Sequence, residues 1–173
     1  MIEYQTNNCN QTENNIAVHP FHNENKNTMH TLDLTITPVT PGERLPVQKP
    51  SPGILQVMKE AGIRNLVSDH YDLLVKSEIN HLFPTVPEQL EMAKQHAADF
   101  FIQVMGGPPY FNMHRGQPAM TRRHAQFQIT AEGRVAWLKC YQQLIAGLDL
   151  PEHLKQSYWN YLNNFSSWMV NTG

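Results

Sequence analysis

Three stretches of the sequence carry residue types that can do chemistry. The first is the block MGGPPYFNMHRGQPAMTRRHAQF, residues 105–127, which is rich in histidine, arginine and aromatic residues. The second is Trp137 inside AWLKC, and the third is Tyr71, with Phe83 in LFP following twelve residues later. Imidazole is the commonest metal ligand, and phenol and indole groups donate hydrogen bonds. These stretches indicate a functional site rather than a bundle that only packs a core.

Helical periodicity predicts five helices that position these residues. Each has a recognisable start: Pro52 after the capping residue Ser51, Asn65, Pro87, the capping residue Thr130, and Pro151. The run Gly106-Gly107-Pro108-Pro109 ends the third helix. Residues 110–130 are expected to be irregular, except for a short helix across residues 118–124. We therefore expect an all-α domain over residues 51–173, with Tyr71 on its second helix and Trp137 on its fourth.

Residues 1–50 are expected to form a largely disordered extension rich in Asn and Pro. Residues 1–30 contain eight asparagines and few large apolar side chains, so they cannot bury enough surface to offset the entropy of ordering. In residues 31–37, leucine and isoleucine alternate with polar residues, which is a weak strand pattern. Four prolines in residues 38–50 favour a linker or an extended arm. The segment 31–37 could instead pack on the helical domain or swap into a partner.

The composition excludes several classes of function. The net charge is −2 and the pI is about 6.5, whereas an electrostatic nucleic-acid binder carries a basic face and a high pI. No apolar run approaches the length of a membrane-spanning helix, and the N-terminus lacks the pattern of a secretory signal. Cys9 and Cys140 form no CxxC pair, so we expect no disulfide framework and a cytoplasmic location. His19 and His22 could bind a transition metal, but incidental histidines in an Asn-rich tail are the favoured interpretation.

Taken together, these motifs resemble those of one known family, the truncated (two-over-two) haemoglobins, and within it group II. A GGP motif that ends a helix, an RGxP stretch, RH followed by F, and an AWL helix occur in the family's order and at its spacing. The resemblance covers roughly residues 52–170. It implies a truncated globin fold, in which the second and third helices pair with the fourth and fifth in a two-over-two sandwich, and a haem b cofactor.

The resemblance implies roles for three residues near the haem iron. His124 matches the histidine that ligates the iron, which suits a neutral imidazole and leaves its other ring nitrogen to be oriented by a hydrogen bond. Tyr71 and Trp137 match the polar residues on the opposite face of the haem. Their O–H and N–H groups would stabilise the partial negative charge of bound dioxygen in a dry pocket. Core packing is the alternative explanation for aromatic residues on apolar helix faces.

Other matches describe the walls of the expected haem pocket. Phe83 matches an aromatic residue that wedges against the haem, where many relatives carry Tyr or His. Ala93 and Ala97 match two positions on the third helix, and their small side chains leave space over the iron. Phe100 and Phe101 would line the inner wall.

Two basic residues match positions near the haem carboxylates, which are called propionates. Arg123 matches an arginine that contacts a propionate, and His96 could reach one from the rim of the pocket. The sequence departs from the family at two positions. Phe111 stands where relatives commonly have a Tyr that bonds a propionate, with Tyr110 displaced by one residue, which puts that contact in doubt. Gln117 replaces the histidine of the family's RGHP.

The leading hypothesis is a haem-binding globin that reversibly binds dioxygen and other diatomic ligands. The alternative is a haem enzyme with peroxidase or nitric-oxide-detoxifying activity. Ala93 and Ala97 supply no general base for a peroxidase, and His70 is expected to face away from the pocket, since neighbours on a helix point in different directions. A third hypothesis, an interaction module without haem, conflicts with retention of the three residues at the iron. The expected partners are diatomic ligands and a reductase, with no nucleic acid and no membrane, and the protein is expected to be a monomer or a homodimer.

Overall fold

The computed structural model describes residues 31–173, so the expectations for residues 1–30, which concern disorder, His19, His22 and Cys9, lie outside the described residues. Residues 31–173 contain helices and no strand. The elements are α1 (Gly53–Leu74), η1 (Asn80–Leu82), α2 (Pro87–Val104), α3 (Tyr110–Arg115), α4 (Met120–His124), α5 (Ala131–Ala146), α6 (Glu152–Ser166) and η2 (Ser167–Met169), where η denotes a 3-10 helix. The predicted all-α fold class is confirmed. Among these helices we find no candidate for a membrane span.

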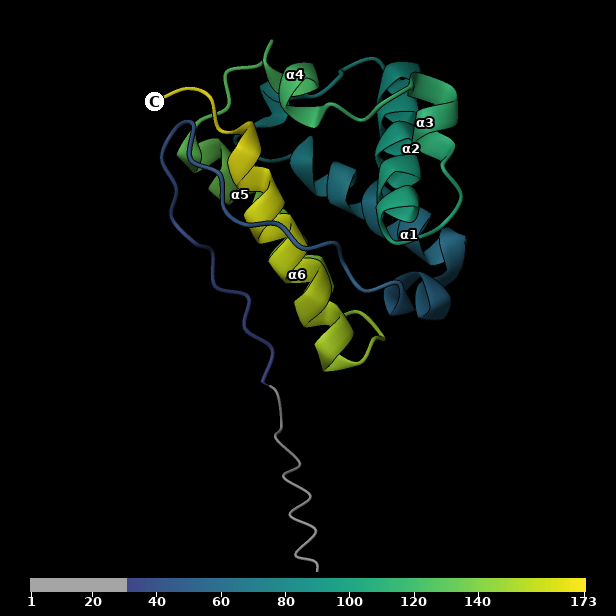
Figure 1. The fold of residues 1–173 in the computed structure, drawn as a ribbon. Coiled ribbons are helices and arrows are strands. Elements are labelled where there is room, and N and C mark those ends of the chain that lie inside the picture. Colours follow the sequence, from purple (N-terminus) through teal and green to yellow (C-terminus); the bar gives the residue numbers. More distant parts are fainter. Residues whose placement is uncertain (1–30) are drawn as a thin grey trace, which may run out of the picture.

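The four long helices form two packed layers (Figure 1). α1 packs against α2, α5 packs against α6, and contacts of α1 with α5 and α6 join the two layers. Buried side chains from all four helices meet in one apolar core, which includes Ile63, Leu66, Phe101, Ile102, Leu138, Tyr141, Tyr158 and Leu162. This is the expected two-over-two sandwich, and the C-terminal half of α1 is the first helix of the first pair.

α1 contains the two helices expected from Pro52 and Asn65, joined across a kink that lies six residues before Asn65 rather than at it. It begins at Gly53, whose N–H donates a hydrogen bond to Ser51 Oγ at 3.2 Å, one residue later than expected. Its one interruption lies at Lys59, where φ is 59° and ψ is 173°. Neither Pro nor Gly stands at this position, so no local sequence signal marks where the helix bends.

The other long helices begin where the sequence predicts. Pro87 occupies the first turn of α2, where its missing N–H costs nothing. Thr130 caps α5, because its hydroxyl accepts a hydrogen bond from Gly133 N at 3.0 Å. Pro151 is the last residue before α6.

Residues 110–130 are more regular than expected. The expected short helix around residues 118–124 is present as α4, but α3 was not predicted. Two hydrogen bonds of 3.0 Å join the side chain of Gln103 on α2 to Asn112 on α3. Asp99, buried on α2, also accepts from Arg64 on α1 and bonds His114 on α3. These contacts come from other helices, so periodicity within residues 110–115 does not reveal them.

Residues 31–50, which we call the arm, run in extended conformation along α5 and α6 (Figure 1). Leu34 O accepts a hydrogen bond from Gln142 Nε2 on α5, and Thr35 O accepts one from Trp159 Nε1 on α6. Leu34 and Ile36 pack against the apolar core. The arm therefore packs on the helical domain, which is one of the alternatives that the sequence leaves open.

The arm reverses direction in a tight turn and returns along α6. Glu43 N donates to Thr40 O at 3.1 Å, with Pro41 and Gly42 at the centre of the turn. Gly42 has a φ of 82°, which a type II turn requires at this position and which glycine adopts without strain. After the turn, Leu45 O accepts a hydrogen bond from the indole of Trp168 at 2.9 Å.

The segment 31–37 does not form the weakly indicated strand, because side chains rather than a neighbouring strand take its backbone groups. Thr37 N donates to Asn163 Oδ1 at 3.1 Å, and Thr37 O accepts from Arg134 Nη1 at 2.8 Å. Arg134 is only 3% exposed and also donates to Ser166 Oγ and to Asn163. These bonds join the arm, α5 and α6 at one point.

Replacing Asn163 by Ala is expected to lower the free energy of unfolding by about 1–3 kcal/mol, because it leaves donors of the buried Arg134 and of Thr37 without an acceptor. The measurement is urea denaturation followed by circular dichroism. The matched control is Asn160→Ala on the exposed face of the same helix, which should cost much less. Equal losses in the two variants would contradict a special role for the Asn163 side chain.

Candidate functional site

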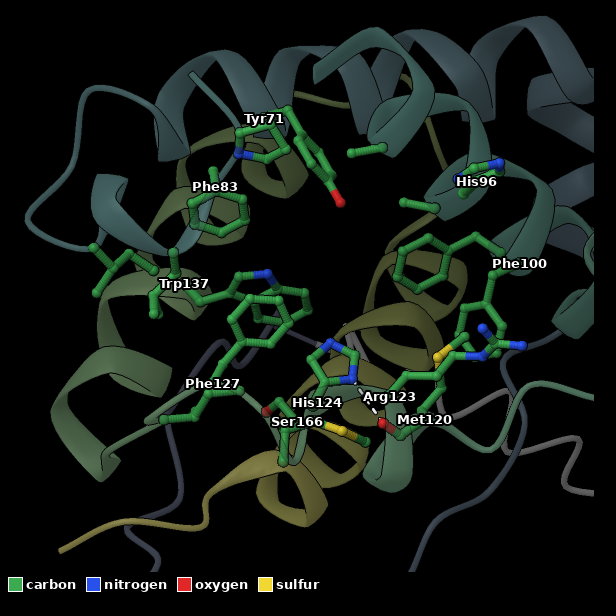
Figure 2. Close-up of a pocket in the computed structure, with 18 of the residues that line it drawn as sticks. Tyr71, Phe83, His96, Phe100, Met120, Arg123, His124, Phe127, Trp137 and Ser166 are labelled. Atoms are coloured by element: carbon green, nitrogen blue, oxygen red, sulfur yellow. Dashed lines mark hydrogen bonds between the residues drawn. The ribbon is translucent and has the colours of Figure 1, made fainter. Parts of the chain in front are cut away.

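A cavity of about 480 Å³ lies between the two helix layers, a volume in the usual range for small-molecule sites. All ten predicted site residues line it: Tyr71, Phe83, Ala93, His96, Ala97, Phe100, Phe101, Arg123, His124 and Trp137 (several are labelled in Figure 2). They come from α1, α2, α4, α5 and the loop after η1. The fold thus gathers on one cavity residues that are spread over more than 60 positions of sequence.

His124 is the last residue of α4, and its ring reaches the cavity (Figure 2). Its Nδ1 lies 2.8 Å from Met120 O. A carbonyl oxygen only accepts hydrogen bonds, so Nδ1 carries the proton and donates it. Nε2 of the neutral ring is then left with a free lone pair. This arrangement fits a histidine that binds a metal through Nε2.

The C-terminal tail holds the segment that follows His124. The side chain of Asn171 donates to Phe127 O at 3.0 Å and accepts from Ile129 N at 3.0 Å. The backbone N–H groups of Asn171 and Thr172 both donate to Ile129 O. Asn171 was not among the predicted site residues, and no local pattern could have identified it because its partners lie more than 40 positions earlier.

Tyr71 and Trp137 border the cavity across from His124 (Figure 2). Within residues 31–173, neither the Tyr71 hydroxyl nor the Trp137 indole N–H has a hydrogen-bond partner among protein atoms, and Figure 2 shows the hydroxyl directed into the cavity. Burial raises the pKa of Tyr71 to about 12, so its hydroxyl keeps its proton at neutral pH. Both groups are therefore available to donate to a ligand in the cavity.

Aromatic and small side chains shape the cavity around these donors. The ring of Phe83 meets the ring of Tyr71 edge to face, with centroids 5.6 Å apart, which fixes the orientation of the phenol. Ala93 and Ala97 lie one turn apart on α2 and leave that part of the wall open. Phe100 and Phe101 are both 7% exposed and connect the cavity wall to the apolar core.

Basic residues gather at one side of the cavity. Arg115 Nη1 donates to His96 Nδ1 at 2.8 Å. Burial and the positive charge of Arg115 lower the pKa of His96. The guanidinium of Arg123 donates to three carbonyl oxygens, those of Arg115, Gln117 and Pro118, and its Nη1 is left without a partner among residues 31–173. Arg123 thus holds the preceding loop in addition to lining the cavity.

The two residues at the first departure from the family pattern, Phe111 and Tyr110, take different positions. Phe111 lines the cavity, is 4% exposed and packs beneath the guanidinium of Arg123, at 5.3 Å. Tyr110 does not line the cavity, and its hydroxyl donates to Glu60 Oε1 on α1. Tyr110 therefore does not replace the family's tyrosine.

Several cavity residues were not predicted, and most come from the C-terminal half of the chain. Those from this half include Met120, Phe127, Ile129, Leu162, Phe165, Ser166 and Met169. The periodicity of α6 marks Leu162 and Phe165 as buried, but it does not distinguish the cavity wall from the core. The missing information is the packing of η2 against α4 and of the arm against α6.

His70 faces away from the cavity, as predicted, and packs behind Trp137. Its Nε2 donates to Trp137 O at 3.2 Å, and its ring stacks on Tyr141 with centroids 3.5 Å apart. Because the ring is 1% exposed, burial lowers the pKa of His70 to about 3. The imidazole is therefore neutral in the folded protein and supports the helix that carries Trp137.

The neutral His70 should make the protein less stable in mild acid. The unfolded chain takes up a proton at His70 as the pH falls below about 6.5, while the folded chain does so only near pH 3. Its contribution to stability is full above about pH 6.5 and decreases as the pH falls from there towards 3. Between about pH 7.5 and about pH 5, we expect the wild type to lose about 2 kcal/mol more than His70→Gln.

This difference is measured by urea denaturation of both proteins at the two pH values. His153→Gln, which removes an exposed histidine from α6, serves as the control and should keep the pH dependence of the wild type. If the free energy of unfolding depended on pH in the same way in His70→Gln and in the wild type, His70 would not be a buried neutral imidazole in the folded protein.

Comparison with known proteins agrees with this geometry. Residues 56–171 match the model of the bacterial-like globin family. Over 81 residues, the chain is 32% identical to group 2 truncated hemoglobin 3-1 of Lotus japonicus, a match that covers 46% of this chain and 48% of that protein. The chain therefore spans about half the length of this curated relative.

Solved structures extend the comparison to the fold. Phosphate-bound Hell's gate globin IV matches with a TM-score of 0.71 and 34% identity, over 79% of this chain and 86% of that chain. The truncated oxygen-avid haemoglobin from Bacillus subtilis matches with a TM-score of 0.63 and 26% identity, over 70% of this chain and 99% of that chain. The chain therefore belongs to the bacterial-like globin family, and it is similar to relatives and solved structures described as group II truncated haemoglobins.

Proposed function

We propose that the cavity binds haem b with His124 as the iron ligand, and that the protein binds dioxygen and other diatomic ligands reversibly. The observation that carries this proposal is the hydrogen bond from His124 Nδ1 to Met120 O, which leaves Nε2 as a ligand atom at a largely apolar cavity. Haem, if bound here, would supply an iron able to bind a diatomic ligand, with His124 holding the iron. The donor set and the cavity walls fit this group.

The remaining residues explain how the chain would hold a flat apolar group with two acidic substituents. Phe83, Phe100 and Phe127 offer apolar surface to its ring. Its carboxylates would lie at the basic side of the cavity, where Arg115 and the free Nη1 of Arg123 can pair with them. The aromatic contact between Phe111 and Arg123 keeps that guanidinium in place.

Across from His124, Tyr71 and Trp137 would donate hydrogen bonds to the oxygen of a diatomic ligand. Their donors lack protein partners within residues 31–173, so no hydrogen bond to the described protein has to break when a ligand is bound. In a cavity that excludes water, such donors act more strongly than in solvent. The B. subtilis relative, which is described as oxygen-avid, supports dioxygen as the ligand.

The cavity favours reversible binding over peroxidase chemistry. A peroxidase benefits from a base that takes a proton from peroxide. On this side of the cavity the wall carries Ala93 and Ala97, and Tyr71 is protonated at neutral pH. His70, the next residue along the chain, packs on Tyr141 instead. Tyr71 and Trp137 can stabilise a ligand, but neither can act as the base.

Titration with haemin tests the iron ligand. The wild type is expected to bind one haem and to give a strong Soret band, then a stable oxygenated spectrum after reduction and exposure to air. His124→Ala should lose the six-coordinate oxygenated spectrum, because it removes Nε2. His153→Ala, on the exposed face of α6, should behave like the wild type. An unchanged oxygenated spectrum in His124→Ala would exclude His124 as the ligand.

The donors are tested by stopped-flow measurement of dioxygen dissociation. Tyr71→Phe and Trp137→Phe should each raise the dissociation rate about tenfold or more, because each removes a hydrogen bond to a partly charged oxygen. Tyr110→Phe removes a hydroxyl that bonds Glu60 outside the cavity, and it should leave the rate unchanged. Wild-type rates in both cavity variants would show that these residues only pack.

A further inference from the structure

A second hollow, of about 660 Å³, lies beside the main cavity and is separated from it by Phe100, Met120 and Phe165, which line both. We call it the arm groove. One side is the returning half of the arm, another is the loop before α4 with α4 itself, and the floor comes from α2, α6 and η2. The family model begins at residue 56, so the arm side of this groove lies outside the part of the chain that the model matches.

The floor of the arm groove is aromatic. Tyr161 stacks on Phe165 with ring centroids 5.2 Å apart, and Phe165 lies 5.8 Å from Trp168. The guanidinium carbon of Arg44 lies 5.5 Å from the centroid of the Trp168 ring. Val47 and Val104 add aliphatic surface. The floor therefore offers continuous apolar contact to a ligand, with a cation at its edge.

Three exposed cations surround this floor, and no acidic residue of the described segment 31–173 lines the groove. The cations are Arg44 and Lys49 on the arm and Arg122 on α4. Within residues 31–173, none of the three makes an ion pair. On a chain with a net charge of −2, three unpaired cations around one hollow form a local positive potential that would attract an anion.

Tyr161 is the one largely buried polar group in the lining. Its side chain belongs to a residue that is 4% exposed, and its hydroxyl has no hydrogen-bond partner among residues 31–173. Burial raises the pKa of Tyr161, so the hydroxyl is protonated at neutral pH and is a donor without an acceptor. Among the described residues, the fully buried side-chain atom without a partner is Tyr158 Oη rather than the hydroxyl of Tyr161, so a ligand or water in the groove can reach the Tyr161 hydroxyl as an acceptor.

We propose that the arm groove binds an amphipathic carboxylate, an acid whose apolar body lies on the aromatic floor and whose anionic head pairs with Arg44, Lys49 and Arg122. The hydroxyl of Tyr161 donates to an oxygen of the same ligand. An apolar ligand would leave the cations unused, and a small inorganic anion would leave the floor uncovered. Only a ligand with both an acidic head and an apolar body would use the cations and the aromatic floor together.

Calorimetric titration of the haem-loaded protein with dodecanoate tests this site. We expect one saturable binding event that weakens as salt is added, and at least tenfold weaker binding of dodecanol and of inorganic phosphate. The double variant Arg44→Glu/Arg122→Glu should weaken dodecanoate binding at least tenfold. Tyr161→Phe should weaken it several-fold, while Lys139→Glu, the same kind of charge reversal on the exposed face of α5, should have no effect.

Two results would overturn the proposal. One is dodecanoate binding of wild-type strength in the Arg44→Glu/Arg122→Glu variant, with its fold verified by circular dichroism. The other is equal affinity for dodecanol and dodecanoate. Neither arginine lines the main cavity, so the comparison of variants remains valid on haem-free protein if haem does not bind. Failure of the proposed haem site and failure of the arm groove are therefore separate outcomes.

Discussion

The guanidinium of Arg134 is buried where the arm, α5 and α6 meet, and a buried charge is tolerated only when its donors are paired. Its acceptors are Thr37 O on the arm and Ser166 Oγ and Asn163 on α6. All three elements must converge for the charge to be satisfied. Arg134 and Ser166 also line the main cavity, so the same interaction fixes the arm and closes one part of the cavity wall.

The two faces of the main cavity are held in different ways. Tyr71 and Trp137 stand on long helices that pack in the core, and His70 and Phe83 brace their rings. His124 stands on α4, a helix of five residues. Its ring is oriented by the hydrogen bond to Met120 O in the same turn, and the segment that follows it is held by the bond from Asn171 to Phe127 O. The donors are therefore positioned by packing, whereas the imidazole is positioned by a small set of hydrogen bonds.

Local sequence signals predicted the starts of the long helices, which Pro87, Thr130 and Pro151 mark. The residues of the site, by contrast, were predicted from the resemblance of motifs around His124 and Trp137 to the truncated haemoglobins, and these residues line the main cavity. The parts that were not predicted depend on contacts between distant segments. Helix α3 is held by α2, and Asn171 acts on a loop more than 40 residues earlier. Arm residues find their partners only after α6 is in place, and the groove beside them has no sequence pattern of its own.

The partners of the arm are synthesised long after the arm itself. Asp33 and Thr37 bond to residues 123 and 126 positions later in the sequence. At about 5–20 residues per second, the ribosome needs on the order of ten seconds to make that stretch. During this time Leu34 and Ile36 have no core to pack against, and the backbone of the arm can pair with strands of other chains. The arm thus emerges first among the described segments and docks last, so its protection during translation depends on how quickly α6 follows.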